Sequence, residues 1–433
     1  MARSKTTPGL ALRQQAAGRL AEVLKGASFA PFSASEMADG RDRALANRLV
    51  TTALRRHGHL NRIVAHLLDR GVPAKSGSFE AILRISLAQL LWLPELGDHS
   101  ALFLAGEAMR ADAKAQHLGK LMNAVLRRAQ KEAAQFRSAP AELLFPDALR
   151  EKWGLTYGSD AVAAFAVALT EGAPLDLTLR DDDPALVTAL DAAAVLADSV
   201  RVIDRDRAVS ELPGYAEGRF WVQDAAAAIP ARLLDLPAGS RVLDIGAAPG
   251  GKTAQLCKAG YAVTALDSDA DRMRRLEGNL SRLGYAAETV VADALTYQPG
   301  PVFDGIVLDA PCSATGIFRR HPEVIWHRDA ADIAGRAVLQ RKLLVAAAAM
   351  LKPGGTLIYC VCSLEPEEGE QQAKWLVSAG FKLSLVPVEV GGIGGWAEAL
   401  TPRGTVRTHP ALQAPGDKGG TLDGFFTARF RKG

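Results

Sequence analysis

Two short stretches contain residue types that could do nucleophilic chemistry. "DAPCSATG" places Cys312 three residues after Asp309, and "YCVCSLEPEE" contains Cys360 and Cys362. A thiolate is a strong nucleophile, and a nearby acid can stabilise charge that develops on a substrate. The alternative is a buried, inert thiol, because cysteine is among the most buried residue types. We apply that alternative to Cys257 and Cys360, and take Cys312 and Cys362, at strand ends, as the reactive pair.

A glycine-rich stretch, "LDIGAAPGGKT" (243–253), precedes both cysteines. Its spacing G-x-x-x-x-G-K-T is that of a phosphate-binding P-loop, and "GIVLDAP" (305–311) could be the metal-binding strand of an ATPase. A loop of this kind can equally hold another ligand, because glycine lets the backbone approach closely. The loop alone therefore leaves an ATPase and a different nucleotide-binding enzyme open.

Two acids at strand ends favour a nucleoside ligand over a triphosphate. Asp267 closes "TALDSD", 21 residues after Gly246, where an acid usually binds ribose hydroxyls. Asp293 closes "VVADAL", where it could accept from an adenine amino group. Either acid could instead cap the following helix. Together with the loop they predict S-adenosylmethionine as cofactor, bound by Gly246, Ala247, Ala248, Pro249, Gly250, Gly251, Lys252, Asp267, Asp293 and Asp309.

Two cysteines and an acid beside a methyl donor suit methylation of cytosine at carbon 5. That carbon is a poor nucleophile until a thiolate adds to carbon 6, and a base must later remove the carbon-5 proton so that the thiol can leave. An acid near ring nitrogen 3, such as Asp309, would stabilise the charge on the ring. The sequence thus predicts covalent catalysis by a cysteine.

Strand-like and helical runs alternate from Arg241 onward. The predicted strands are "RVLDIG", "AVTALDSD", "ETVVADAL", "GIVLDAP", "TLIYCVCS", "KLSLVPV" and "GFFTARF", and helices separate the first five. This alternation predicts a parallel, doubly wound sheet. Its ligands should lie beyond the carboxyl ends of the strands, where the candidate residues stand.

The first part of the chain has a different pattern. Residues 1–132 show apolar residues at helical spacing, and they carry 20 Lys and Arg against 11 Asp and Glu, a charge of +9 within a chain of net +3. A basic helical module suggests a polyanionic partner, although a solvated helical surface has the same composition. Residues 139–235 contain prolines and two strand-like runs, 175–180 and 200–206, and predict a small α+β region.

Other classes of protein fit the composition poorly. The start of the sequence has no secretory signal, and the longest apolar run, 343–351, is far short of the ~20 residues that span a bilayer. Four scattered cysteines make neither a disulfide framework nor a zinc site, so no metal is predicted. We expect a cytoplasmic protein with reduced thiols.

Several motifs together resemble a known family. "LDIGAAPGGKT", "LDAPCSATG", "RRHPEVIW" and "YCVCSLEPEE" resemble the RNA 5-methylcytosine methyltransferases of the RsmB (Fmu, Sun) group, and "MNAVLRR" (122–128) resembles the RNA-binding factor NusB. The resemblance extends over nearly the full length, to "DGFFTARF". It implies a multidomain protein with an all-α NusB-like domain (1–138), a small α+β connecting domain (139–235) and a Rossmann-like α/β methyltransferase domain (236–433).

The resemblance also implies roles for residues. Cys362 takes the position of the nucleophile, Cys312 that of the second cysteine, which helps to release the product, and Asp309 lies on a cofactor position. Lys252 could contact either cofactor or target base, and Cys360 is conceivable as an alternative nucleophile. The implied substrate is ribosomal RNA of the small subunit (16S).

Further expectations concern the partner. "RRHPEVIWHR" (319–328) is a candidate RNA-contacting loop, the alternative being an ordered surface turn. RNA is the expected partner, with no membrane and no obligate protein partner evident. Two other functions stay open, a P-loop ATPase and a non-catalytic RNA-binding assembly or antitermination factor.

Overall fold

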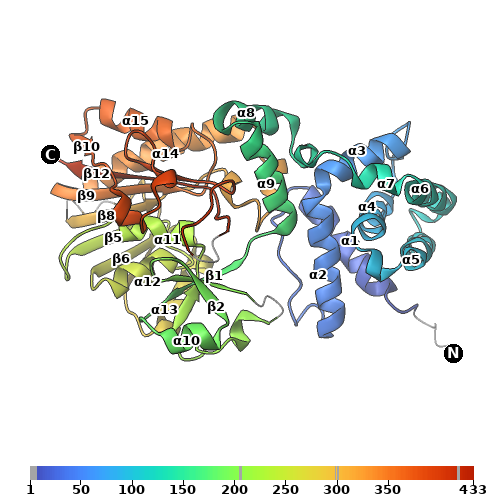
Figure 1. Cartoon of the computed structure of the whole chain (residues 1–433), viewed down its shortest axis with the longest axis horizontal. Helices are drawn as coiled ribbons and strands as arrows, with labels where there is room; N and C mark the ends of the chain where they lie inside the picture. The colour runs from blue at the N-terminus through green and yellow to red at the C-terminus, as the bar shows by residue number, and fades with distance from the viewer. Residues whose placement is uncertain (1–6, 204–206, 298, 300–301, 417–419) are drawn as a thin grey trace. The chain divides into compact units, whose positions relative to one another are not determined.

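The computed structural model describes residues 7–203, 207–297, 299, 302–416 and 420–433 (Figure 1). The chain divides into two compact units. The helical unit is Met1–Glu171 with His321–His327, and the sheet unit is Gly172–Arg320 with Arg328–Gly433. The predicted boundaries at 138 and 235 stay predictions. Among the described residues, no helix is both long enough and apolar enough to cross a bilayer.

Most helices of the helical unit pack around one core, and the last two along the chain pack against each other. The helices are α1 (Leu10–Leu24), α2 (Gly40–Arg55), α3 (His57–Leu67), α4 (Phe79–Trp92), α5 (Asp98–Ala111), α6 (Gly119–Lys131), α7 (Ala133–Arg137), α8 (Asp147–Tyr157) and α9 (Ser159–Glu171). Helix α4 is buried on nearly every side, so it forms the centre of the core. The surrounding helices are amphipathic, and each turns an apolar face to α4 or its neighbours.

One segment of the helical unit comes from far along the chain. Residues 321–327 follow the loop that carries Cys312, yet they belong to the helical unit. The Glu323 carboxylate accepts a hydrogen bond from the Phe29 backbone N–H (2.9 Å), and His327 bonds the Val23 carbonyl (2.8 Å). We call 321–327 the strap.

A small antiparallel sheet opens the sheet unit. Its strands are β1 (Leu175–Leu179), β2 (Ala192–Leu196), β3 (Ser199–Val202) and β4 (Phe220–Val222), in the order β2-β3-β1-β4, with α10 (Pro184–Ala189) beside them. The two predicted strand-like runs correspond to β1 and β3. Strand β4 is followed after two residues by α11 (Ala225–Arg232), which packs on the large sheet.

The large sheet has the order β10-β12-β9-β8-β5-β6-β7, with β11 on β12. Its strands are β5 (Arg241–Ile245), β6 (Ala262–Asp267), β7 (Glu288–Val291), β8 (Phe303–Asp309), β9 (Leu351–Val361), β10 (Leu383–Leu385), β11 (Val406–Thr408) and β12 (Phe425–Lys432). Strands β5 to β9 are parallel, whereas β10, β11 and β12 pair antiparallel. The predicted doubly wound sheet is confirmed as a Rossmann-like α/β fold, but it is mixed rather than wholly parallel.

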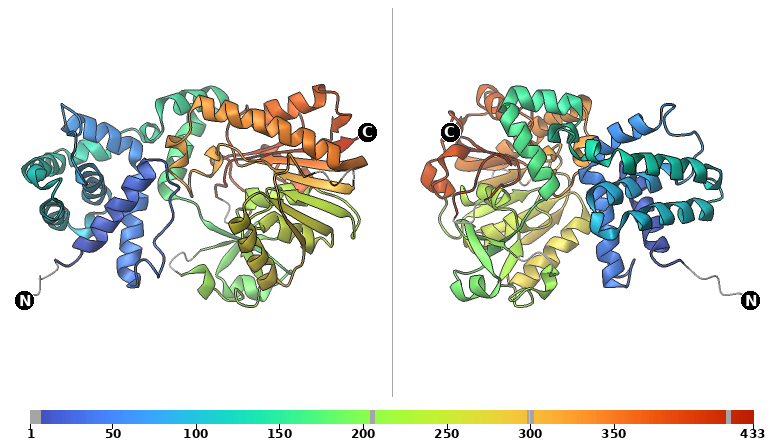
Figure 2. Two further views of the ribbon diagram at one scale, coloured as in Figure 1. Left: turned by 180° about the vertical axis from the view of Figure 1, so that it is seen from behind. Right: turned by 45° about the vertical axis from the view of Figure 1, so that its right-hand side comes forward.

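Helices cover both faces of this sheet (Figure 2). Helices α14 (Ala330–Met350) and α15 (Glu370–Ser378) pack on one face. Helices α11 (Ala225–Arg232), α12 (Gly251–Lys258) and α13 (Ala270–Leu283) pack on the other. The strand order reverses between β5 and β8, so a crevice is expected where their carboxyl ends diverge.

Candidate active site

Two cavities meet at the carboxyl ends of the parallel strands. The first, of about 540 Å³, is lined by the glycine loop 246–251 and Lys252. The second, of about 600 Å³, is lined by Asp267 and Asp293. Gly246, Asp309 and Cys362 line both cavities. The two ligands of a transfer reaction could therefore meet at Asp309 and Cys362.

The two cysteines face each other across adjacent strands. Cys312 follows β8, Cys362 follows β9, and their sulfur atoms lie 3.4 Å apart. The hydrogen bond with Cys362, together with burial, raises the pKa of Cys312 well above its ordinary value. These surroundings favour the protonated form of Cys312, and either thiol could donate in the contact between the two sulfur atoms.

Asp309 is bound to Lys252. The lysine Nζ lies 2.7 Å from the Asp309 Oδ2, and it also lies 5.3 Å from the centre of the Phe425 ring. Burial opposes the lysine's charge, yet the attraction of Asp309 raises the pKa of Lys252 above its ordinary value. Lys252 thus stays a cation. Of the two cavities, the first is the one that Lys252 lines.

The acids predicted to bind the cofactor lie in the second cavity. Asp267 is 4% exposed and accepts from the backbone N–H groups of Ala248 and Asp269. The helix cap is supplied by Asp269 instead, which accepts from two N–H groups of α13. Asp293 lines the second cavity and caps a turn through the Leu295 N–H (2.9 Å). The capping alternative therefore does not account for Asp267.

The glycine turn is shaped by close backbone contact. Gly246 has φ +76°, and a Cβ there would lie 2.4 Å from the Asp309 carbonyl oxygen. Gly250 also has a positive φ, 103°, and directly precedes α12. The absence of side chains brings the loop against β8 and leaves backbone lining both cavities, which fits an extended nucleoside ligand.

A buried carboxylate beneath the loop was not predicted. Asp244 is 0% exposed, lines the first cavity, and accepts from the Thr253 hydroxyl at 2.7 Å. Its Oδ1 atom has no hydrogen-bond partner. Burial raises the pKa of Asp244 to about 6. Only its position before the glycine turn marked it in the sequence.

Aromatic side chains form further parts of the first cavity. Trp221 comes from β4, Phe425 from β12, and Tyr215 from the loop before β4. The Trp221 indole donates to Gln223 (2.8 Å), so its ring is fixed. These residues were also missed, because they belong to elements separated by more than 200 positions in sequence.

Cys360 is placed away from both cavities. It is 0% exposed near the carboxyl end of β9, within the core beneath α11, and burial raises its pKa well above the ordinary value. Its S–H points to the Asp309 Oδ1 at 3.8 Å. The geometry favours Cys362 over Cys360 as the nucleophile, and the role of Cys362 stays a prediction.

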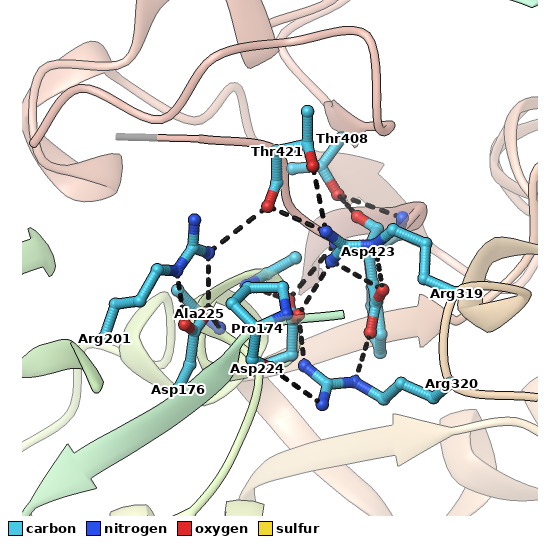
Figure 3. A network of polar contacts seen from close by, with 12 residues as sticks. Pro174, Asp176, Arg201, Asp224, Ala225, Arg319, Arg320, Thr408, Thr421 and Asp423 are labelled. Atoms are coloured by element: carbon cyan, nitrogen blue, oxygen red, sulfur yellow. Dashed lines mark hydrogen bonds and ion pairs between the residues drawn. The ribbon is translucent and has the colours of Figure 1, made fainter. Parts of the chain in front are cut away.

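The arginines after Cys312 are held in a buried ion-pair network (Figure 3). Arg319 and Arg320 both contact Asp224 and Asp423, at distances between 2.7 and 3.2 Å. Both arginines lower the pKa of Asp224 to about 2, against the opposing effect of burial. The network joins the Cys312 loop to the start of α11 and to the residue two before β12.

The prediction that 319–328 contacts RNA stays a prediction, but the structure leaves Arg319 no surface with which to do so. Arg319 is 0% exposed, and its guanidinium forms ion pairs with Asp224 and Asp423. Residues 321–327 form the strap, in which Trp326 packs edge-on against His57 at 4.7 Å. Charge and ring content suggested a surface loop, whereas Arg319 is buried and Arg320, although paired in the network, lines the first cavity.

No group of three or more His, Cys, Asp or Glu suited to a metal ion occurs among the described residues. A sulfonium nucleoside fits the donors that are present: a carboxylate at the end of β6, backbone of the glycine loop, and a cavity of about 600 Å³. Cavities of several hundred Å³ are typical of cofactor sites.

Comparisons with known proteins agree with this geometry. A family model described as 16S rRNA methyltransferase RsmB/F matches residues 231–431, and the NusB family model matches residues 11–131. The ribosomal RNA small subunit methyltransferase B of Xanthomonas campestris pv. campestris is 37% identical over 396 residues, which cover 86% of this chain and 89% of the relative.

Solved structures share the fold. The crystal structure of PH0851 superposes with a TM-score of 0.78 at 21% identity and covers 99% of this chain and 100% of its own. A methyltransferase homologue from Pyrococcus horikoshii has a TM-score of 0.55 at 26% identity, covering 68% of this chain and 98% of its own.

These matches contradict the two open alternatives, an ATPase and a non-catalytic factor, and they confirm S-adenosylmethionine as the cofactor. The chain belongs to the RsmB/F family of S-adenosylmethionine-dependent rRNA methyltransferases and carries a NusB-family domain.

Proposed function

We propose that this protein methylates carbon 5 of a cytosine in RNA, with small-subunit ribosomal RNA as substrate, through a bond between Cys362 and carbon 6. One observation carries the proposal: two thiols 3.4 Å apart lie where two cavities meet. A methyl transfer to nitrogen or oxygen needs no such pair. The names of the relatives support ribosomal RNA.

The first step uses the Cys362 thiolate. It adds to carbon 6, the C5=C6 double bond becomes an enamine, and carbon 5 becomes nucleophilic. The Lys252 ammonium, held by Asp309 in the first cavity, would stabilise the negative charge on the ring. We therefore assign Lys252 to the target base. S-Adenosylmethionine, when bound, supplies the methyl group.

Cys312 is suited to the release step. Its pKa is raised chiefly by Cys362, so bonding Cys362 to carbon removes that cause and lets Cys312 lose its proton to solvent. The Cys312 thiolate then takes the carbon-5 proton, the C5=C6 bond re-forms, and the carbon–sulfur bond breaks to return the Cys362 thiolate.

The test is adduct formation. With RNA and S-adenosylmethionine, Cys312→Ala should accumulate a covalent protein–RNA adduct on a denaturing gel, because release is blocked. Cys362→Ala should form none and should not methylate. Methylation by the Cys362 variant would overturn the assignment of the nucleophile, and bisulfite mapping of ribosomal RNA would identify the methylated position.

A further inference from the structure

The residues that directly follow the two cysteines share one hydrogen-bond acceptor. The Glu368 Oε1 accepts from the Ser313 backbone N–H at 2.9 Å. Its Oε2 accepts from the Ser313 hydroxyl and from the Ser363 hydroxyl, each at 2.5 Å. One carboxylate therefore bonds the neighbour of Cys312 and the neighbour of Cys362.

Glu368 is itself fixed in place. It is 0% exposed, and its Oε1 also accepts from the Gln340 amide at 3.1 Å. Its backbone carbonyl accepts from the Tyr359 hydroxyl at 2.5 Å. Four donors converge on the two carboxylate oxygens, and such charge-assisted bonds are short and strong. The acceptor is rigid enough to define where its donors lie.

We propose that Glu368 is a positioning residue that sets the separation of the Cys312 and Cys362 sulfur atoms. It lines neither cavity, so it acts through Ser313 and Ser363. Each serine is one peptide unit from its cysteine, and a shift of the serine moves the neighbouring thiol. The catalytic consequence rests on the proposed function, in which both thiols react.

Replacement by glutamine would disturb this arrangement at constant size. A carboxylate only accepts, whereas one end of a glutamine amide is a donor. An amide nitrogen at the Oε1 position would face the Ser313 backbone N–H, which can only donate. At the Oε2 position it would force the Ser313 and Ser363 hydroxyls to turn from donating to accepting, and in either case the charge-assisted bonds are lost. The loops after β8 and β9 would then lose their common anchor.

Glu365→Gln is the matched control. Glu365 is also 0% exposed and lies in the same loop, and its carboxylate accepts from Thr315, three residues after Cys312, at 3.2 Å. The direct measurement is the rate of disulfide formation between Cys312 and Cys362 with diamide, which removes two electrons and two protons from the thiols. Mass spectrometry of the linked peptides identifies the bond.

We expect Glu368→Gln to slow this disulfide formation by about tenfold or more, and kcat by a similar factor, because small misplacements of reacting groups are costly. The Kd of Glu368→Gln for S-adenosylmethionine should stay within about twofold of that of the unmodified chain. The rate of disulfide formation in Glu365→Gln should also stay within about twofold. Unchanged disulfide and methylation rates in a folded Glu368→Gln variant would overturn the proposal.

Ser363→Ala carries the test if Glu368→Gln does not fold. It removes one hydroxyl and should slow disulfide formation less strongly, and an unchanged rate would reject the positioning role. The disulfide rate depends on no reaction with RNA. Absence of an adduct in Cys312→Ala would therefore count against the proposed function while leaving the measurement of Glu368 intact.

Discussion

Asp309 is the side chain on which the site converges at the scale of single residues. Its Oδ2 binds Lys252, its Oδ1 faces the Cys360 thiol, and it lines both cavities. Its carbonyl oxygen also bounds the Gly246 turn. One residue at the end of β8 thus connects the glycine loop, the lysine and the sulfur-bearing strand.

The raised pKa of Asp244 predicts how the free energy of unfolding depends on pH. Its pKa rises from 3.8 to about 6 on folding, so the folded chain binds more protons than the unfolded chain between those values. Its contribution to stability is therefore present at low pH and is lost as pH rises from about 4 to about 6. Asp244→Asn, which cannot ionise, should escape this loss.

The difference in free energy of unfolding between Asp244→Asn and the unmodified chain should move by up to about 3 kcal/mol in favour of the variant between pH 4 and pH 7, since one pKa unit is about 1.4 kcal/mol. Urea unfolding at several pH values measures it. A difference that is flat with pH would contradict the buried, raised carboxyl.

The proposed contact of Lys252 with the target base predicts how its substitution changes kcat and the Kd for S-adenosylmethionine. If its ammonium acts on the target base, Lys252→Gln should lower kcat by about a hundredfold, the effect of removing one charge-stabilising donor. The Kd for S-adenosylmethionine should stay within about twofold. Calorimetric titration and single-turnover methylation separate the two effects. A large rise in that Kd with little change in kcat would place Lys252 on the cofactor side.

At the scale of elements, the loop after β8 is anchored at both ends. Near its start Ser313 is bonded by Glu368, and further on Arg319 and Arg320 are held by Asp224 and Asp423. The strap follows at once and packs within the helical unit. The position of Cys312 therefore depends on contacts with several elements of the fold.

Glu323 gives the element-scale prediction. It is 3% exposed, and its carboxylate accepts from the Phe29 N–H. Glu323→Ala should leave that donor unpaired and cost about 1–3 kcal/mol. Hydrogen exchange should accelerate in peptides covering residues 23–32 and 321–327. Glu323→Gln keeps an acceptor and is the control; equal exchange in all three proteins would refute the anchor.

At the scale of the whole molecule, the charge is concentrated in the helical unit. On α6, Lys120, Arg127 and Lys131 are exposed at spacings of seven and four residues, which place them on one helix face. Such a face suits the phosphates of an RNA backbone. We propose that this unit contributes RNA affinity rather than chemistry.

Substitution of Lys120, Arg127 and Lys131 by Gln together should weaken RNA binding and reduce the slope of log K against log salt by about 2, at roughly 0.7 for each phosphate contact on a single strand. Filter binding from low to moderate salt measures the slope. Neutralising the exposed Lys25, Arg70 and Lys75 is the control. Identical slopes in both triple variants would remove α6 from the RNA interface.

The sequence by itself determined most of the strands, although not β2, β4 and β11, together with the glycine turn and the candidate cysteines, because hydrophobic periodicity and turn chemistry are local properties. The RsmB/F family, the Rossmann-like fold and the cofactor followed from these motifs and are confirmed. The assignments of Cys362, Cys312, Asp309 and Lys252 to steps of the reaction stay predictions.

Only the tertiary structure decided which distant groups meet. No local pattern states that Glu368 bonds Ser313 and Ser363, or that Arg319 is buried against Asp224. The stretch 319–328 likewise reads as a basic, aromatic surface loop until its packing partners are known. Burial and pairing depend on chain segments that lie up to about 300 residues apart in sequence. The folded chain also brings the two cysteine motifs together, so that the Cys312 and Cys362 sulfur atoms lie 3.4 Å apart.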